Sequence, residues 1–200
     1  MDITEAQEIL GGTYSFVSGD LHQVIEDLDL PKAARILDIG TGEGIMAITL
    51  ALNGYQVLTG EPGDDESVYA KRNWRDNAKK VHVDDLIEFE SFNAAKMPYA
   101  DSSFDGIFLL GALHHIDEAE REEVFRELVR ISAPGATICF FEPKRELIDK
   151  MRILEPTHPD AAVPDMYAQG MKLASHKVSG LNFDAFVYRK QGVIKCKIEN

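Results

Sequence analysis

The chain has 200 residues, 44% of them hydrophobic, and a formal net charge of -13 at pH 7. This hydrophobic content suits one globular domain with a sizeable core. The negative charge disfavours nucleic acid as a partner, because binding a phosphate backbone requires a basic face. No apolar run approaches the ~20 residues that span a membrane, and the acidic start of the chain is unlike a signal peptide.

The two cysteines, Cys139 and Cys196, do not have the spacing of metal ligands. We therefore expect reduced thiols in a cytoplasmic protein. Nothing in the sequence indicates an oligomeric state.

Residues 1–34 are expected to form a helical lid. A capping-box pattern and apolar residues at helical spacing predict a helix that ends near Pro31. The preceding stretch, residues 11–16, contains glycines and aromatic side chains and is expected to be flexible. Tyr14 or Phe16 could close over a ligand there; a surface loop pinned by one aromatic residue is the alternative.

An apolar strand over residues 36–39 runs into a glycine-dense turn and then into a helix over 45–53. Gly40, Gly42 and Gly44 stand at alternate positions, where the lack of a Cβ lets a ligand approach the backbone. A strand, a glycine turn and a helix in this order predict a nucleotide-type ligand above the N-terminus of the helix.

Two interpretations of this turn compete. Residues 42–47 match the G-x-G-x-x-A form of the dinucleotide fingerprint, which favours a nicotinamide-dependent oxidoreductase. Asp38 argues against it, because a carboxylate beside the turn would repel a pyrophosphate and attract an ammonium or sulfonium group. Glu61 ends the next apolar run, about 20 residues downstream, where such folds place an acid that binds ribose hydroxyls. Together the two acids favour a ribosylated, cationic ligand without phosphate.

Strands and helices alternate through the middle of the chain, which predicts an α/β fold with a mostly parallel sheet and right-handed crossovers. The expected elements are a helix within 64–83, a strand over 86–92, a strand over 104–110, a helix over 118–132 and a strand over 137–142. The apolar run of the strand over 104–110 indicates burial on both faces. Trp74 is expected to pack on the sheet rather than to border a pocket. The charged residues at 118–123 are expected to form a solvated helix face.

Substrate specificity is expected to reside in the C-terminal part of the chain. The expected elements are a helix over 145–154, a proline-rich loop over 156–164, a helix near 166–176, and a β-hairpin whose arms, 183–190 and 193–198, flank Gln191-Gly192. The proline-rich loop either shapes the substrate mouth or merely connects its neighbours.

Five motifs stand in order along most of the chain: residues 38–44, Glu61, residues 93–98 with 103–105, residues 113–117, and residues 127–130 with 134–135. With these motifs the sequence resembles the class I S-adenosylmethionine-dependent methyltransferases, in particular the small-molecule group that includes the ubiquinone-pathway and type-11 enzymes. The resemblance implies a Rossmann-like, doubly wound, mostly parallel seven-stranded sheet with an antiparallel C-terminal hairpin and helices on both faces. It also implies a single domain over 1–200, with the lid at 1–34, a cofactor-binding core at 35–143, and a substrate-side segment with the hairpin at 144–200.

The resemblance implies S-adenosylmethionine as the cofactor and S-adenosylhomocysteine as its product. The turn at 38–44 would lie along the methionine part, Glu61 would bind the ribose, and residues 93–98 would border the adenine. The residues expected to bind the cofactor are Asp38, Gly40, Gly42, Gly44, Glu61, Pro62, Asn93, Ala94 and Gly111. Asn93 replaces the family's usual aspartate and can still accept a hydrogen bond from the adenine amino group. Pro62 stiffens its turn and removes one backbone donor.

Methyl transfer from a sulfonium is an in-line displacement, so the protein mainly aligns the reactants and excludes water, and no metal is required. His114 or His115, just after the strand over 104–110, is the expected base for a hydroxyl or thiol acceptor. Adjacent residues of an extended segment point in opposite directions, so at most one is expected to face the cofactor; alternatively, both order the loop. Glu142 and Tyr14 are second-rank candidates for the base. The other histidines are expected to be structural or exposed, namely His22, His82, His158 and His176.

The leading hypothesis is a methyltransferase that acts on a small molecule. A non-catalytic S-adenosylmethionine-binding module or partner subunit is a second hypothesis. A protein methyltransferase is a third, and the acidic composition would then favour a basic target. A nicotinamide-dependent oxidoreductase would bind NAD tightly and ignore the sulfonium, which is the reverse of what Asp38 predicts. The sequence does not identify the methyl acceptor.

Overall fold

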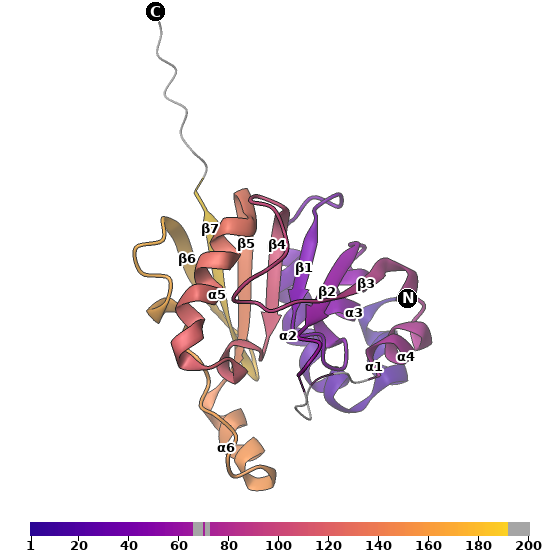
Figure 1. Cartoon of the computed structure of the whole chain (residues 1–200). Helices are drawn as coiled ribbons and strands as arrows, with labels where there is room; N and C mark the ends of the chain where they lie inside the picture. Colours follow the sequence, from indigo (N-terminus) through magenta and orange to yellow (C-terminus); the bar gives the residue numbers. More distant parts are fainter. Residues whose placement is uncertain (66–69, 71–72, 192–200) are drawn as a thin grey trace, which may run out of the picture.

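A seven-stranded mixed sheet forms the centre of the molecule (Figure 1). The computed structural model describes residues 1–65, 70 and 73–191. The strands are β1 (Ile36–Ile39), β2 (Val57–Glu61), β3 (Ile87–Ser91), β4 (Phe104–Leu110), β5 (Ser132–Pro143), β6 (Leu173–Ser179) and β7 (Phe183–Lys190). Their order is β3-β2-β1-β4-β5-β7-β6, with β1 to β5 parallel and β7 antiparallel to both of its neighbours. The predicted fold class, including the antiparallel C-terminal strands, is confirmed.

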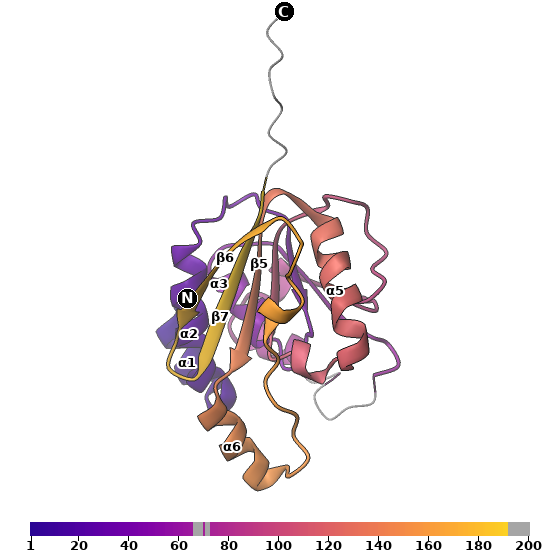
Figure 2. The same cartoon turned by 90° about the vertical axis from the view of Figure 1, so that its left-hand side faces the viewer.

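Helices cover both faces of this sheet. The α-helices in the described part of the chain are α1 (Ile3–Leu10), α2 (Gly12–Asp27), α3 (Ile45–Leu52), α4 (Trp74–Lys80), α5 (Glu118–Ile131) and α6 (Arg145–Leu154). Short 3-10 helices occur at η1 (Asp84–Leu86), η2 (Leu113–His115) and η3 (Pro164–Met166). Helices α1, α2 and α3 lie on one face and α5 on the other, while α6 extends beyond the end of the sheet (Figure 2). None of the helices in the described residues is long and apolar enough to cross a membrane.

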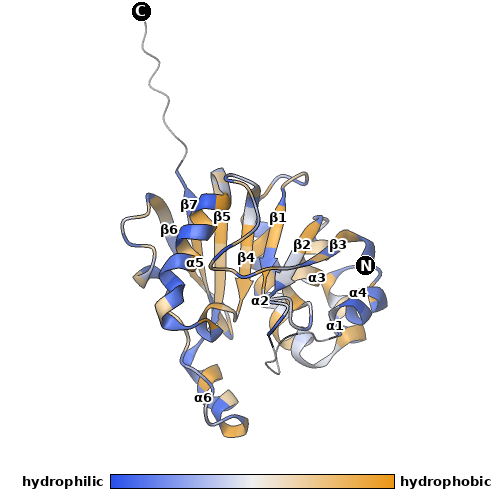
Figure 3. Ribbon diagram, in the orientation of Figure 1, coloured by the Kyte–Doolittle hydropathy of each residue, from blue (hydrophilic) through white to orange (hydrophobic). Residues whose placement is uncertain are grey.

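The sheet separates two hydrophobic cores. Successive residues of β4 point to opposite faces, so Phe108 belongs to the core shared with α2 and α3, whereas Ile107 and Leu109 belong to the core shared with α5. All three side chains are fully buried, which confirms the predicted burial of this strand on both faces. Figure 3 shows hydrophobic residues along the central strands and hydrophilic ones on α5.

The N-terminal helices extend further than predicted. Residues 12–16, expected to be flexible, form the first turns of α2, and Gly11, with a φ of 58°, separates α2 from α1. The expectation was wrong because Tyr14 is buried in the core, 3.4 Å from the hydroxyl oxygen of Thr49 on α3. Phe16, in contrast, is exposed. Burial of one aromatic side chain therefore orders the segment as a helix.

The C-terminal hairpin is built from different residues than predicted. Strand β7 lies between β5 and β6, so both of its edges are paired, and the predicted pairing of 183–190 with 193–198 is wrong. Residues 193–198, and Cys196 among them, lie outside the described residues. The helix predicted near 166–176 is also wrong, because residues 173–179 form the edge strand β6. This strand is polar and largely exposed, so its conformation depends on hydrogen bonding to β7 rather than on an apolar pattern of its own.

Gly60 on β2 offers a test of how tightly the strands pack. A Cβ at Gly60 would lie 2.1 Å from the carbonyl oxygen of Glu90 and 2.3 Å from the ring of Phe92. We expect Gly60→Ala to lower the free energy of unfolding by about 1–3 kcal/mol, the usual range for overpacking. Gly19→Ala is the matched control, because this exposed glycine lies within α2 and its Cβ would make only an ordinary contact at 3.7 Å.

The control should raise the free energy of unfolding by about 0.5–1 kcal/mol, since alanine is the better helix former. Chemical denaturation of both variants measures these changes. Equal stability of Gly60→Ala and the wild type would show that β2 and β3 can separate at little cost.

Candidate active site

A cavity of about 640 Å³ opens at the carboxyl ends of β1, β2 and β4. In folds of this class the carboxyl ends of parallel strands, where the strand order reverses, are the usual place for a ligand. Most of the residues predicted as binding or catalytic line the cavity, namely Gly40, Gly42, Glu61, Pro62, Asn93, Ala94, Gly111, His114 and His115. Asp38 and Gly44 do not line it.

The turn after β1 is fixed by its own backbone. The Gly40 N–H donates a hydrogen bond to the Gly60 carbonyl at 2.9 Å. A Cβ at Gly40 would lie 3.1 Å from the Cβ of Ala112, and the φ of 92° is left-handed, so glycine is required here. The Gly42 N–H donates to the Glu61 carboxylate at 3.1 Å, which holds this buried acid against the turn.

Asp38 lies behind the turn rather than on the cavity wall. Its side chain is fully buried and accepts a hydrogen bond from the Thr59 hydroxyl at 2.8 Å. Thr59 uses its single proton in this bond, so the Thr41 hydroxyl, 2.9 Å away, donates to Thr59. Burial raises the pKa of Asp38 to about 8 and outweighs the opposing effect of the Thr59 hydrogen bond. The expected direct contact of Asp38 with a cationic ligand is therefore wrong, because the carboxyl group fixes the turn from behind.

Gly44 is required by packing rather than by a ligand. It precedes α3 with a φ of 81°, and a Cβ at this position would lie 2.9 Å from the Cβ of Trp74. Trp74 stacks on Phe89, with 6.2 Å between the ring centroids, and does not line the cavity. The expectation that Trp74 packs on the sheet is confirmed.

The loop after β3 uses the Asn93 side chain for its own structure. The Asn93 amide oxygen, expected to receive the adenine amino group, accepts a hydrogen bond from the Ala95 N–H at 2.7 Å. The neighbouring side chains of Phe92, Ala94 and Ala95 line the cavity and are apolar. This part of the cavity therefore offers an apolar wall.

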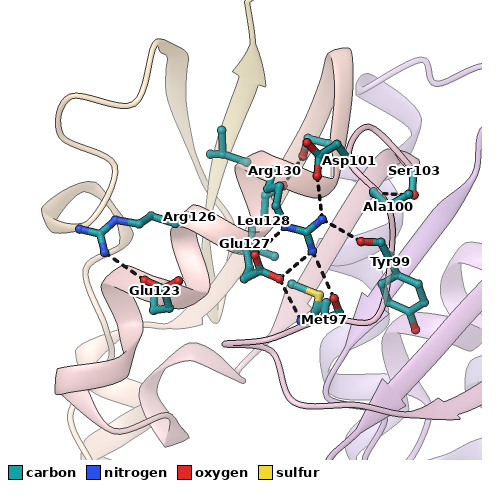
Figure 4. A network of polar contacts seen from close by, with 12 residues as sticks. Met97, Tyr99, Ala100, Asp101, Ser103, Glu123, Arg126, Glu127, Leu128 and Arg130 are labelled. Atoms are coloured by element: carbon teal, nitrogen blue, oxygen red, sulfur yellow. Dashed lines mark hydrogen bonds and ion pairs between the residues drawn. The ribbon is translucent and has the colours of Figure 1, made fainter.

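Arg130 on α5 holds the rest of this loop in place (Figure 4). Its guanidinium donates hydrogen bonds to the carbonyls of Met97 and Tyr99 and to the Asp101 carboxylate. Glu127 completes the network, because its carboxylate pairs with Arg130 at 2.6 Å and accepts a hydrogen bond from the Met97 N–H at 2.9 Å. One arginine thus connects α5 to the loop that borders the cavity.

The two adjacent histidines both line the cavity. The expectation that at most one faces the cofactor assumed an extended segment, but residues 113–115 form the 3-10 helix η2. Neighbouring side chains on such a helix are about 120° apart, so both can reach one side. The ring centroids of His114 and His115 are 4.3 Å apart. His115 is exposed, and partial desolvation of its ring, reinforced by the neighbouring His114 and His158, lowers its pKa to about 4.

His114 pairs with a buried acid. Its Nδ1 lies 2.8 Å from a carboxylate oxygen of Glu142, at the end of β5, and both side chains are 2% exposed. A carboxylate only accepts hydrogen bonds, so Nδ1 carries the proton and the lone pair of the ring is on Nε2. This Nε2 has no hydrogen-bond partner among the described residues. Glu142, a second-rank base in the sequence prediction, therefore orients His114.

His158 joins these residues from the proline-rich loop. Its ring centroid lies 5.4 Å from those of both His114 and His115, so this buried histidine, expected to be structural or exposed, lies beside the two on η2. Arg152 on α6 donates to the His158 carbonyl at 2.8 Å, and the Ala162 N–H donates to Glu142 at 3.2 Å. The loop therefore packs against the histidines and does more than connect its neighbours.

Arg121 does not follow the prediction that the charged residues at 118–123 form a solvated face of α5. It is half-buried and donates hydrogen bonds to the carbonyls of His114, at 3.2 Å, and Ile116, at 2.9 Å. The two hydrogen bonds satisfy backbone carbonyls in η2 and just after it. Carbonyls at the end of a helix have no partner within the helix itself. Arg121 thus fixes the backbone that carries His114.

A match to the family described as a methyltransferase domain covers residues 37–140, just over half of the chain. The chain belongs to this methyltransferase family. S-adenosylmethionine is the family's methyl donor. The matched residues run from β1 into β5 and include the glycine turn, Glu61 and both histidines of η2.

Relatives and solved structures agree with the methyltransferase family. The 27-O-demethylrifamycin SV methyltransferase of Amycolatopsis mediterranei is 36% identical over 112 residues, which are 56% of this chain and 39% of that protein. The chain thus spans less than half of the length of this curated relative.

The similar solved structures share the fold. A protein from Methanococcus maripaludis has a TM-score of 0.70 at 17% identity, over 95% of this chain and 94% of that chain. A SAM-dependent methyltransferase from Methanosarcina mazei has a TM-score of 0.60 at 20% identity, over 84% of this chain and 97% of that chain.

The cavity of this methyltransferase domain fits the methyl donor. Its volume lies within the ~300–1,000 Å³ of sites for small ligands. Glu61 offers carboxylate oxygens to hydroxyl groups, and the turn after β1 lets a ligand approach the backbone closely. Ile39, Phe92 and Ala94 supply apolar walls for a flat base.

Sequence reasoning missed several residues of the cavity wall. Those outside the predicted set include Thr13 and Val17 of α2, Glu120 and Val124 of α5, and Met151 of α6. Val17 and Val124 are buried, whereas Thr13 was expected in a flexible segment and Glu120 on a solvated helix face, so neither pattern indicated a cavity wall. No local sequence pattern indicated that His158 belongs to the site, because its position depends on the folding of the loop that carries it.

The Arg130 network predicts how the cavity loop is held. We expect Arg130→Ala to raise the amide exchange rates of residues 97–101 roughly tenfold, which corresponds to about 1.4 kcal/mol, because charge-assisted hydrogen bonds to this loop are lost. Arg126→Ala is the matched control on the same helix, since Arg126 pairs only with exposed Glu122 and Glu123 among the described residues. Hydrogen–deuterium exchange measures both variants. The same protection in both would show that Arg130 does not hold the loop.

Proposed function

We propose that this chain is an S-adenosylmethionine-dependent methyltransferase that transfers a methyl group to a small-molecule acceptor by in-line displacement. The observation that carries the proposal is one cavity lined by the glycine turn, by Glu61 and by His114, whose ring the buried Glu142 orients. The name of the Amycolatopsis relative, a methyltransferase of a rifamycin, supports a small-molecule acceptor. A cavity with one half suited to the donor and another suited to an acceptor favours an enzyme over a module that only holds the cofactor.

The donor half of the proposed site lies along the strand ends. Glu61 accepts hydrogen bonds from ribose hydroxyls, and the turn at Gly40 and Gly42 lies along the methionine part of the cofactor. Pro62, Ala94 and the Asn93 loop form the wall beside the adenine. Asp38 and Gly44 act indirectly, and Gly111 acts through its backbone. The bound cofactor supplies the methyl group on a sulfonium, so the chain needs to supply only alignment and exclusion of water.

The acceptor half of the proposed site contains the base. The Nε2 lone pair of His114 takes the proton of an acceptor hydroxyl or thiol, and Glu142 offsets the positive charge that the ring then gains. His115 is the weaker proton acceptor, because its pKa of about 4 leaves little driving force at neutral pH. Tyr14 is a buried residue of α2 and does not line the cavity, so it is not part of this proposal.

Transfer of a labelled methyl group tests the proposed function. The purified chain is incubated with labelled S-adenosylmethionine and a fractionated extract of the source organism, with His114→Asn as the comparison variant. We expect label in the low-mass fraction and a rate about 100- to 10,000-fold lower in the variant, the usual contribution of a positioned base. Label in the protein fraction would indicate a protein methyltransferase. No transfer despite cofactor binding would favour the non-catalytic module.

Glu61 tests the donor half independently of the acceptor. We expect Glu61→Ala to weaken S-adenosylmethionine binding by about 1.5–3 kcal/mol, roughly 10- to 150-fold, because a hydrogen bond to a charged group is lost. Glu88→Ala on the neighbouring strand β3 is the control, since Glu88 is exposed and does not line the cavity. Isothermal titration calorimetry measures both, with circular dichroism as the check of folding. Unchanged affinity in folded Glu61→Ala would contradict the assignment of the ribose site.

A further inference from the structure

We propose that His114, His115 and His158 form a binding site for one divalent transition-metal ion of the zinc type on the wall of the cavity. This inference goes beyond the proposed function. Metal binding is a property of the chain itself and does not depend on the identity of the methyl acceptor.

The ring nitrogens of the three histidines lie slightly further apart than they would around a bound metal ion. One ring nitrogen of each residue lies within 4.8 Å of one ring nitrogen of each of the others. Zinc binds imidazole nitrogen at ~2.0–2.1 Å, so two nitrogens on one tetrahedral ion are ~3.3 Å apart. The rings need to close by at most about 1.5 Å, a distance that small side-chain rotations cover. Three histidine ligands leave the fourth position to water or a substrate.

Two of the three histidines are oriented by carboxylates, as metal-binding histidines usually are. Nδ1 of His114 lies 2.8 Å from Glu142, and Nδ1 of His158 lies 3.1 Å from Glu155. A carboxylate on Nδ1 fixes the proton there and makes Nε2 the metal ligand in both rings.

Buried polar atoms at the cluster support the same conclusion. The His114 side chain is 2% exposed, and its Nε2 has no hydrogen-bond partner among the described residues. A buried nitrogen left in this state is destabilising, and a bound ion would offset that cost. One oxygen of Glu142, also 2% exposed, is without a hydrogen-bond partner in the same described part of the chain. A cation beside this buried carboxylate is electrostatically favourable.

The position of the cluster suggests what the fourth ligand is. His114 and His115 line the cavity, whereas His158 does not and closes the cluster from behind. An ion held by the three residues therefore presents its open position to the cavity and can bind an oxygen or nitrogen atom of the acceptor. This role of the ion, unlike metal binding itself, rests on the proposed function. In the metal-bound chain the Nε2 lone pair of His114 is shared with the ion, so coordination replaces proton transfer to this residue.

Metal titration without cofactor or acceptor tests the site. The chain is prepared without a histidine tag, stripped with a chelator and titrated with Zn²⁺ by calorimetry. We expect one equivalent of Zn²⁺ to bind and His158→Ala to weaken binding at least about 100-fold, because it removes a ligand. His176→Ala is the matched control, since this exposed histidine lies on the edge strand β6. It should bind Zn²⁺ as the wild type does.

A second variant keeps the test decisive if His158→Ala does not fold. Glu155→Ala changes a half-exposed side chain, with 41% exposure, and should weaken Zn²⁺ binding about 10- to 100-fold by releasing the His158 ring. Equal Zn²⁺ affinity in the wild type and in a folded variant of either kind would overturn the proposal. Failure of methyl transfer in the labelling experiment would leave the titration result unaffected, so the two proposals can fail separately.

Discussion

The candidate site depends on the register in which β1 pairs with β2 and β4. Ile39, the last residue of β1, pairs with Gly60 on one side and with Leu109 on the other. The residues that follow, Gly40 and Glu61 among them, therefore reach the same edge of the sheet. A shift of one residue in the pairing of β1 with β2 would turn the side chains of β2 to the opposite face and remove the Glu61 carboxylate from the cavity.

Buried polar contacts stabilise this register where the glycine turn begins. The hydroxyls of Thr41 and Thr59 and the carboxyl of Asp38 form a chain of hydrogen bonds across β1, β2 and the turn. Polar groups inside a core must find such partners, so the chain accepts few alternative arrangements. Gly60 lets β2 approach the backbone of the next strand closely. The proposed donor side of the cavity is thus built on rigid elements.

The proposed acceptor side is built on loops that the rigid part holds in place. Helix η2 follows β4, and the loop with His158 follows α6, which extends past the sheet (Figure 2). Glu142 at the end of β5 contacts both segments, through His114 and Ala162. Loops carried by a rigid scaffold are where specificity usually resides. The two proposed uses of the His114 ring, as a base and as a metal ligand, both follow from the way Glu142 orients it.

Local patterns in the sequence determined most of the fold and the donor side of the site. The apolar run at 104–110 predicted β4, and the glycine turn with Glu61 predicted the cavity wall, because apolar spacing and glycine content are properties of a short segment. Strand β6 was missed, since its polar residues form a strand only through pairing with β7. The secondary-structure propensities of these residues contain no information about pairing with another strand.

Only the tertiary structure decided which residues meet in the cavity. Asp38 and Gly44 belong to the glycine motif in the sequence, but burial of one and packing of the other against Trp74 direct both away from the ligand. His158 reaches His114 because β5 and α6 carry the chain out and the following loop returns it to the end of the sheet. The spacing of residues along the chain does not predict this proximity of His158 and His114. The proximity depends on contacts between segments that are distant in sequence.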